Sequence, residues 1–400
     1  MLNGRSALLR LQQFLALESA GGIVLGAAAV VALILANSPL GSLYTGLLDL
    51  PMAVQVGGFL LNKPLLLWIN DGLMAVFFLL VGLEVKREVL DGGLSEPSKA
   101  VMPVLAALGG MVVPAFIYVL LNWGDVQALR GWAIPTATDI AFALGVLSLV
   151  GSRAPPSLRI FLLAVAIIDD LGAILIIALF YTGGVSWIAF AFALAGIAVL
   201  ALFNLTGVTH RAPYILAGVF LWVCVLKSGI HATLAGVVVG VAVPLRTTRS
   251  DSPLIRLEHD LHPWVAFGVL PAFAFANAGV TLIGITIADL LHPVELGIVF
   301  GLIIGKPLGI AGLIWAATHF GLAKLPEDAD WRQIYGLALL TGIGFTMSLF
   351  IGGLAFSAEG YNVDIRIGVL IGSLFSGICG YLLLRNGRLL AQPKSTVTTS

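Results

Sequence analysis

Two adjacent aspartates, Asp169 and Asp170, lie within an apolar run from Ile160 to Phe180 that is long enough to cross a bilayer as a helix. A charge in the middle of a membrane helix costs about 2.5–3.5 kcal/mol on insertion scales, so intramembrane carboxylates commonly mark ion paths or proton relays. Other apolar stretches also carry ionisable residues, namely Asp71, Glu84, Asp139 and Lys306. A single buried aspartate can be a mere polar tie between helices, whereas three aspartates and a lysine together favour a functional site.

Helix geometry separates the two neighbours, because consecutive residues point about 100° apart and do not share a face. Asp169 and Asp170 must therefore serve different partners. One carboxylate can meet Lys306, whose ammonium would otherwise be an unpaired buried charge, while the other joins Asp139 in lining a cavity. An oxygen-rich pocket of this kind suits a small hard cation. Protons compete for the same carboxylates, and competition combined with alternating exposure of the site gives exchange.

Composition predicts an all-α polytopic membrane protein, since 59% of the 400 residues are hydrophobic and only 10% are charged. Twelve apolar stretches can each supply the roughly 20 residues that a membrane-spanning helix needs. Residues 1–390 are predicted to form a single transmembrane transporter domain, and the Ser- and Thr-rich tail at 391–400 is expected to be a disordered cytoplasmic segment. The net charge of zero gives no hint of nucleic-acid binding, so the lipid bilayer is the only partner that composition demands.

Basic residues predict the orientation of the chain. With twelve alternating spans, most of the 21 lysines and arginines fall on the side shared by both termini, which is therefore expected to be cytoplasmic. The apolar stretch from Gly21 to Ala36 lacks a credible cleavage site and is expected to remain as the first span. The cysteines, Cys224 and Cys379, lie in apolar segments and receive no redox or metal role, and no cofactor is expected.

Two spans carry signs of a break in mid-membrane. TATDIAFALG, from Thr136 to Gly145, follows Pro135, and GIGFTMSLFI, from Gly342 to Ile351, has two glycines near its start. Thr341 and Thr346 are placed to satisfy backbone groups freed by the second break. Interrupted segments in opposite halves of a chain point to a transporter site built from inverted repeats.

Broken helices leave partial charges in the bilayer, positive at N-termini and negative at C-termini. Asp139 and Lys306 have the right signs to neutralise them. Lys306 thus has two candidate roles, as a salt-bridge partner or as a compensator of carbonyl ends, and the sequence does not separate them. The neighbouring Pro307 predicts a local kink.

The loop after the first span contains VQVGGFL, from Val54 to Leu60, whose partial alternation around two glycines suits a short hairpin. The edge of an exposed hairpin can pair with a second copy of itself. An ordinary loop with a local turn fits the same residues.

These motifs together resemble the NhaA-type sodium/proton antiporters, and the resemblance covers nearly the whole chain. It is carried by a series of segments in the family's order: FFLLVGLEVKRE (77–88), TATDIAFALG, AIIDDLGA (166–173), HATLAG (231–236), LEHDLHPWVAF (257–267), AFANAGV (274–280), GKPLG (305–309) and GIGFTMS (342–348). The resemblance implies a twelve-helix antiporter of the bacterial inner membrane that exports Na⁺ or Li⁺ in exchange for more than one proton. Such exchange is electrogenic and is activated at alkaline pH.

The resemblance also implies roles for particular residues. Asp170 and Asp139 correspond to the ion-binding carboxylates, with Thr138 beside the latter, and Asp169 to a gate and proton-linked carboxylate paired with Lys306. The fourth and eleventh helices would be the interrupted, crossed pair, and the hairpin at Val54–Leu60 would contribute to a homodimer. The candidate pH-sensing residues lie at the cytoplasmic helix ends and are Glu84, Lys86, Arg87, Glu88, Glu258, His259 and His262. A solvated charged cluster explains the same residues, and a packing or hydrogen-bonding role is favoured for His231.

Two rival classes fit less well. An intramembrane aspartyl protease would need a GxGD pattern, but Asp169 follows Ile167 and Ile168. A passive cation channel gives no reason for a lysine opposite the acids. The sequence therefore predicts a transporter rather than an enzyme.

Overall fold

Helices form nearly all of the structure, a computed structural model described here for residues 19–57, 59–246, 252–286, 289–356 and 360–386. The tail at 391–400, for which the sequence predicts disorder, lies outside the described residues. The first half contains α2 (Ala20–Ala36), α3 (Gly41–Leu48), β1 (Pro51–Val56), β2 (Phe59–Pro64), α4 (Leu65–Trp68), η1 (Ile69–Leu73), α5 (Met74–Leu90), α6 (Pro97–Leu121), η2 (Ala128–Thr136), α7 (Ile140–Val150), η3 (Gly151–Arg153), α8 (Pro156–Phe180) and α9 (Trp187–Leu205). The second half contains α10 (Arg211–Ser228), α11 (Leu234–Ala242), α12 (Pro253–Trp264), η4 (Val265–Val269), α13 (Leu270–Ala278), η5 (Asp289–Leu291), α14 (Pro293–Phe300), η6 (Gly301–Gly305), α15 (Lys306–His319), α16 (Trp331–Leu340), α17 (Phe345–Ala355) and α18 (Asn362–Arg385).

Many of these helices can cross a membrane. Among the described residues, nine helices are long and apolar enough, or up to eleven when two bent pairs, α2 with α3 and α16 with α17, are each counted as one span. This confirms a multi-pass helical membrane protein, but twelve full-length spans are not found in this part of the chain. The difference lies at α11, which has nine residues and is therefore only about 14 Å long, half the hydrocarbon thickness. Pro244, which has no amide hydrogen, lies two residues after its last residue, Ala242.

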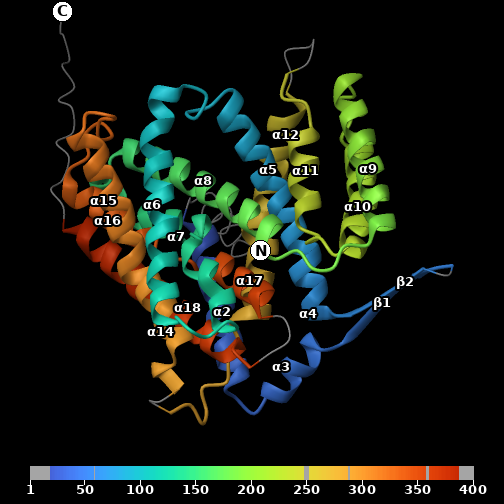
Figure 1. Ribbon diagram of the computed structural model, residues 1–400, viewed down its shortest axis with the longest axis horizontal. Coiled ribbons are helices and arrows are strands. Elements are labelled where there is room, and N and C mark those ends of the chain that lie inside the picture. Colours follow the sequence, from blue (N-terminus) through green and yellow to red (C-terminus); the bar gives the residue numbers. More distant parts are fainter. Residues whose placement is uncertain (1–18, 58, 247–251, 287–288, 357–359, 387–400) are drawn as a thin grey trace, which may run out of the picture.

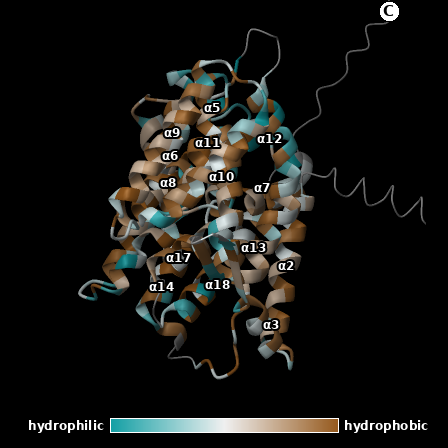
Figure 2. Ribbon diagram, turned by 90° about the vertical axis from the view of Figure 1, so that its right-hand side faces the viewer, coloured by the Kyte–Doolittle hydropathy of each residue, from teal (hydrophilic) through white to brown (hydrophobic). Residues whose placement is uncertain are grey.

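The helices, arranged as in Figure 1, pack around two apolar cores. The smaller core joins α5, α9, α10, α11 and α12 on one side of the molecule. The larger core is formed by most of the other helices, with α6 against α15 and α16 against α18. Apolar residues also cover much of the helical outer surface, with hydrophilic residues more frequent towards the helix ends, as expected for a protein surrounded by lipid (Figure 2).

The two predicted breaks are present and lie against each other. In the first, the 3₁₀-helix η2 ends at Thr136, the chain is extended at Ala137, and α7 begins after Asp139. In the second, α16 ends at Leu340 and α17 starts after Gly344, with a bend of 44°. The amide of Asp139 donates a hydrogen bond of 2.6 Å to the carbonyl of Ile343, which joins one break directly to the other.

Strands β1 and β2 form the hairpin that the sequence predicts, although it is longer than the Val54–Leu60 segment. Their antiparallel register pairs Val56 with Phe59 and Pro51 with Pro64. Gly57 has a φ of 58°, in the left-handed region that favours glycine in a tight turn. The hairpin projects from the helical body beside α4 (Figure 1).

Candidate functional site

Asp139 caps two half-helices at once. Its Oδ1 accepts a hydrogen bond of 3.0 Å from the amide of Phe142 at the start of α7. Its Oδ2 accepts bonds from the amide of Thr346, at 3.1 Å, and from the hydroxyl of Thr346, at 2.6 Å, at the start of α17. One carboxylate therefore faces the positive ends of both half-helices, which is the compensating role predicted for it.

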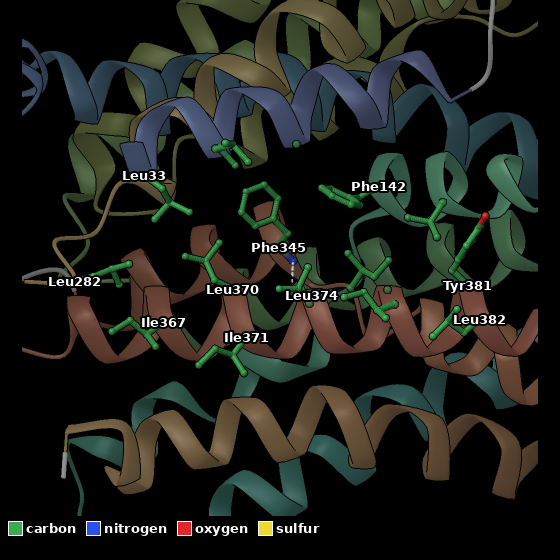
Figure 3. A pocket seen from close by; sticks show the side chains of 18 of the residues that line it. Leu33, Phe142, Leu282, Phe345, Ile367, Leu370, Ile371, Leu374, Tyr381 and Leu382 are labelled. Carbon is green, nitrogen blue, oxygen red and sulfur yellow. Dashed lines mark hydrogen bonds between the residues drawn. The ribbon is translucent and has the colours of Figure 1, made fainter. Parts of the chain in front are cut away.

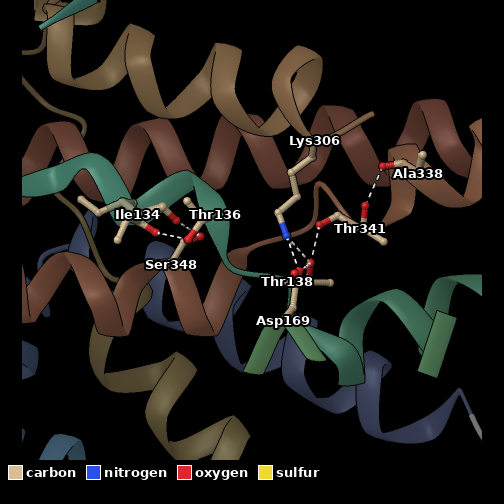
Figure 4. Close-up of polar contacts among 9 residues, drawn as sticks. Ile134, Thr136, Thr138, Asp169, Lys306, Ala338, Thr341 and Ser348 are labelled. Carbon is tan, nitrogen blue, oxygen red and sulfur yellow. Dashed lines mark hydrogen bonds and ion pairs between the residues drawn. The ribbon is translucent and has the colours of Figure 1, made fainter. Parts of the chain in front are cut away.

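Lys306 and Asp169 form an ion pair inside the bundle (Figure 4). The lysine Nζ lies 2.6 Å from Asp169 Oδ2, and the side chains are 0% and 1% exposed. Nζ also donates to the hydroxyl of Thr138. That hydroxyl lies 2.6 Å from Asp169 Oδ2 and 3.0 Å from the carbonyl of Thr341, and its single proton can be donated to either. Of the two roles left open for Lys306, the contacts correspond to the salt bridge.

The segment before Lys306 brings the ammonium to this position. The π-helical turn η6 directly precedes it, and Pro307 sits in the first turn of α15. A Cβ added at Gly305 would come within 2.7 Å of the Cα of Pro114 on α6, so the absence of a side chain permits this close approach. The expected local distortion is therefore a π turn, in which the helix widens by one residue.

Asp170 lies one residue further along α8 and has different surroundings. It is 1% exposed, and its Oδ2 is buried without a hydrogen-bond partner among the described residues. An ionised carboxylate oxygen left unpaired at this depth is costly, whereas a bound proton or cation would satisfy it. The described residues hold no cluster of three or more His, Cys, Asp or Glu placed to bind a metal ion. A cation at Asp170 would thus have hydroxyl, carbonyl or water oxygens among its ligands.

The candidate pH-sensing residues are only partly brought together. Arg87 Nε lies 3.1 Å and 3.0 Å from the two carboxylate oxygens of Glu258, and its Nη1 lies 2.5 Å from Glu88. Glu84 is one helical turn before Glu88 on α5. Lys86 points elsewhere.

The ammonium of Lys86 donates to the carbonyls of Val241 and Val243, each at 2.7 Å, and so caps the C-terminus of α11. His259 and His262 lie exposed on α12.

His231 has the packing and hydrogen-bonding surroundings that the sequence favours. Its ring meets Phe350 of α17 edge-on, with centroids 5.3 Å apart, and Nδ1 lies 2.8 Å from the hydroxyl of Thr233. Its Nε2 lies 3.8 Å from Asp71, which is also paired with Lys63 of the hairpin at 2.7 Å.

The second break differs in one detail from the sequence prediction. Thr341 satisfies a freed backbone group as expected, because its hydroxyl donates to the carbonyl of Ala338 at 2.7 Å. Thr346 instead donates to the side chain of Asp139, so the expectation that its hydroxyl serves a backbone group is wrong. The sequence motifs do not mark Ser348, whose hydroxyl donates to the carbonyl of Ile134 at 2.7 Å and so joins α17 to η2 (Figure 4). The polar residues at the second and fourth positions of FTMS, Thr346 and Ser348, are the sequence signal that could have indicated the contacts to Asp139 and Ile134.

Comparison with known proteins agrees with this architecture. The family described as Na+/H+ antiporter 1 matches residues 12–384. A protein of Rhodospirillum rubrum named Na(+)/H(+) antiporter NhaA is 59% identical, covering 94% of this chain and 96% of that protein. A Pseudomonas putida protein of the same name is 58% identical, covering 92% and 95%.

A solved structure supports the fold alone. The sodium proton antiporter MjNhaP1 from Methanocaldococcus jannaschii aligns over 95% of this chain and 96% of its own, with a TM-score of 0.52 and 18% identity. With a family match over most of the chain and relatives nearly 60% identical, the chain belongs to the Na+/H+ antiporter 1 family.

Proposed function

We propose that this chain exports Na⁺, or Li⁺, across a bacterial inner membrane in exchange for protons. The observation that carries the proposal is the buried group of three aspartates and one lysine at the contact of two broken helices. The relatives named Na(+)/H(+) antiporter support the same reaction. No residue is proposed to be catalytic, because ion exchange requires only that Na⁺ and protons are bound and released, with no other covalent change.

Asp170 is the proposed carrier of the cation and of a proton, with Asp139 and Thr138 as further ligands. In the present conformation both carboxylates are almost completely buried, 1% exposed for Asp170 and 2% for Asp139. A hydrated ion reaches them only after the helices move, which is what alternating access requires. Asp139 accepts three hydrogen bonds, and a carboxylate has about four acceptor positions, so one position is left for the ion.

The Asp169–Lys306 pair is the proposed gate and second proton-linked element. When Na⁺ occupies Asp170, its positive charge favours loss of protons from neighbouring groups. Release of more than one proton per Na⁺ makes the exchange electrogenic, since net charge then crosses the membrane. Moving one elementary charge across the membrane changes the free energy of exchange by about 2.3 kcal/mol for each 100 mV of transmembrane potential.

The proposed complete architecture is one transporter domain over residues 1–390, with twelve spans arranged as inverted repeats. The segment η2–α7 would be the fourth span and α16–α17 the eleventh, crossing at their breaks. The contact between Asp139 and Ile343 supports this arrangement. The bias of lysine and arginine supports a cytoplasmic location for both termini.

Activation at alkaline pH is proposed to arise from the cluster of Glu84, Arg87, Glu88 and Glu258, together with Lys86, His259 and His262. The ion pair of Arg87 with Glu258 links α5 to α12, while Arg87 also pairs with Glu88 on α5 itself, so a change in protonation there alters the packing of two helices. A homodimer is proposed to form through the hairpin, whose exposed edges can pair with a second copy.

Proteoliposomes test the reaction directly. Purified protein is reconstituted, a pH gradient is imposed, and Na⁺, Li⁺ or K⁺ is added while the internal pH is followed with a dye. Collapse of the gradient on addition of Na⁺ supports exchange. Sodium movement without proton movement would indicate a channel instead, and no movement of either ion in folded protein would refute transport.

A further inference from the structure

An apolar groove of about 920 Å³ runs along α18, and its lining residues carry no charge. Its walls are α2, through Gly26, Val30 and Leu33, and α18, from Ile367 to Leu382. The 16 residues of α18 from Ile367 to Leu382 correspond to a length of about 24 Å, which exceeds one leaflet of a hydrocarbon core about 30 Å thick. In Figure 3 the labelled side chains follow α18, with Leu33 opposite and the rings of Phe345 and Phe142 between the two helices.

The groove opens to the outside of the bundle. Leu374 is 62% exposed and Val30 is 54% exposed, although both line it. Because α18 is long and apolar enough to span the membrane, these side chains meet lipid rather than water. Hydrocarbon is therefore the material available to fill this space.

The two ends of the groove differ in the charged residues near them. Beyond Leu382, α18 ends at the exposed Arg385, whose guanidinium lies 5.8 Å from the ring centre of Tyr381, a lining residue. Beyond Leu149, the last lining residue of α7, the short helix η3 ends at Arg153. At the opposite end of α18, Asp364 lies three residues before the first lining residue and Arg366 one residue before it, so an acidic and a basic side chain occur together there, and the guanidinium of Arg366 donates to the carbonyl of Gly279.

The floor of the groove is formed by the second break. Ile343 and Phe345 both line it, and the carbonyl of Ile343 accepts the bond from the amide of Asp139. The ring of Phe345 meets Phe142 of α7 edge-on, with centroids 5.9 Å apart, and its amide donates to Ser373 of α18 at 3.1 Å. Material in the groove thus contacts the residues that hold the two broken helices together.

We propose that this groove is a binding site for an anionic phospholipid, with one acyl chain between α2 and α18 and the phosphate at Arg385 and Arg153. The lipid supports the junction of the broken helices from the side. Its headgroup end is fixed by the two arginines, and its tail packs on Ile343 and Phe345. The site is separate from the ion-binding carboxylates.

The experiment uses full-length protein in nanodiscs of phosphatidylcholine that contain phosphatidylglycerol with a photoactivatable group on its acyl chain. After illumination, labelled peptides are identified by mass spectrometry, and a phosphatidylcholine analogue with the same group serves as the uncharged probe. We expect labelling of α2 and α18 peptides, stronger with phosphatidylglycerol. One basic residue contributes about fivefold to binding at an anionic membrane surface, so Arg385→Gln should lower this preference about fivefold. Lys324→Gln, the same charge change in the exposed loop before α16, should not.

A second variant fills the groove without removing charge. A Cβ at Gly26 would meet the Phe142 ring at 3.5 Å, an ordinary contact, so Gly26→Leu adds volume inside the groove. It should lower labelling with both lipids, while Gly312→Leu, at a position on α15 with open space around it, should leave labelling unchanged. Equal labelling of the groove and of the outer face of α15 by both probes would overturn the proposal. So would disulfide formation between protomers carrying Leu374→Cys, because a second copy would then fill the groove.

Discussion

Replacing Lys306 with alanine should destabilise the protein strongly, because it leaves the carboxylate of Asp169 buried without its counter-charge. Both side chains are at most 1% exposed, so water cannot replace the lost ammonium. Removing one member of a buried ion pair costs about 3–5 kcal/mol. With an unfolding entropy of about 2.1 cal/mol/K per residue, a chain of 400 residues loses about 4–6 °C in Tm.

Two further variants separate the charge effect from loss of packing. In a Lys306→Met, Asp169→Asn double variant neither charge remains, so most of the lost stability should return. Lys99→Ala breaks an exposed pair with Glu96, whose side chains are 65% and 59% exposed, and should change Tm little. Thermal unfolding is followed in one detergent at one pH. A Tm of Lys306→Ala equal to that of the parent, or a double variant less stable than the single one, would refute the assignment of the pair.

Three other predictions concern Asp139, helix packing and assembly. Thr346→Val removes a hydrogen bond to the carboxylate of Asp139, worth about 1.5–3 kcal/mol, and should lower Tm and weaken apparent Na⁺ affinity, while Thr346→Ser restores both; equal values for all three proteins would contradict the capping role. Gly236→Ala places a Cβ against a backbone carbonyl of α5 and should cost about 1–3 kcal/mol in a Tm measurement, whereas Gly312→Ala, in open space, should cost nothing measurable. Replacing Val54–Leu60 with a short flexible turn should convert dimer to monomer in light scattering, and a dimer that persists would exclude the hairpin as the main contact.

The breaks and the buried charges were predictable because they violate the ordinary rules for membrane helices. Pro135 and the glycines at 342 and 344 disfavour a continuous helix, and a buried lysine must have a partner. The structure places both breaks where the sequence indicates and Lys306 against Asp169. The ion-binding roles of these residues remain predictions.

Other features depend on tertiary contacts that no local pattern encodes. The apolar stretch around residue 238 predicts a span, but the described helix is only nine residues long. The sequence predicts one pH-sensing group for Lys86 and its charged neighbours and does not indicate that Lys86 also caps α11, which it does because the C-terminus of that helix lies beside it. The groove along α18 also escapes sequence analysis, since apolar residues that face lipid and apolar residues that line a groove are of the same types.

The most direct test of the central claim is proton release from purified protein when Na⁺ is added. If Na⁺ and protons compete for Asp170, NaCl added to lightly buffered protein should acidify the solution, while choline chloride should not. Asp170→Asn should abolish this release, and Asp49→Asn, at an exposed carboxylate, should preserve it. Undiminished Na⁺-dependent release from folded Asp170→Asn protein would contradict the account.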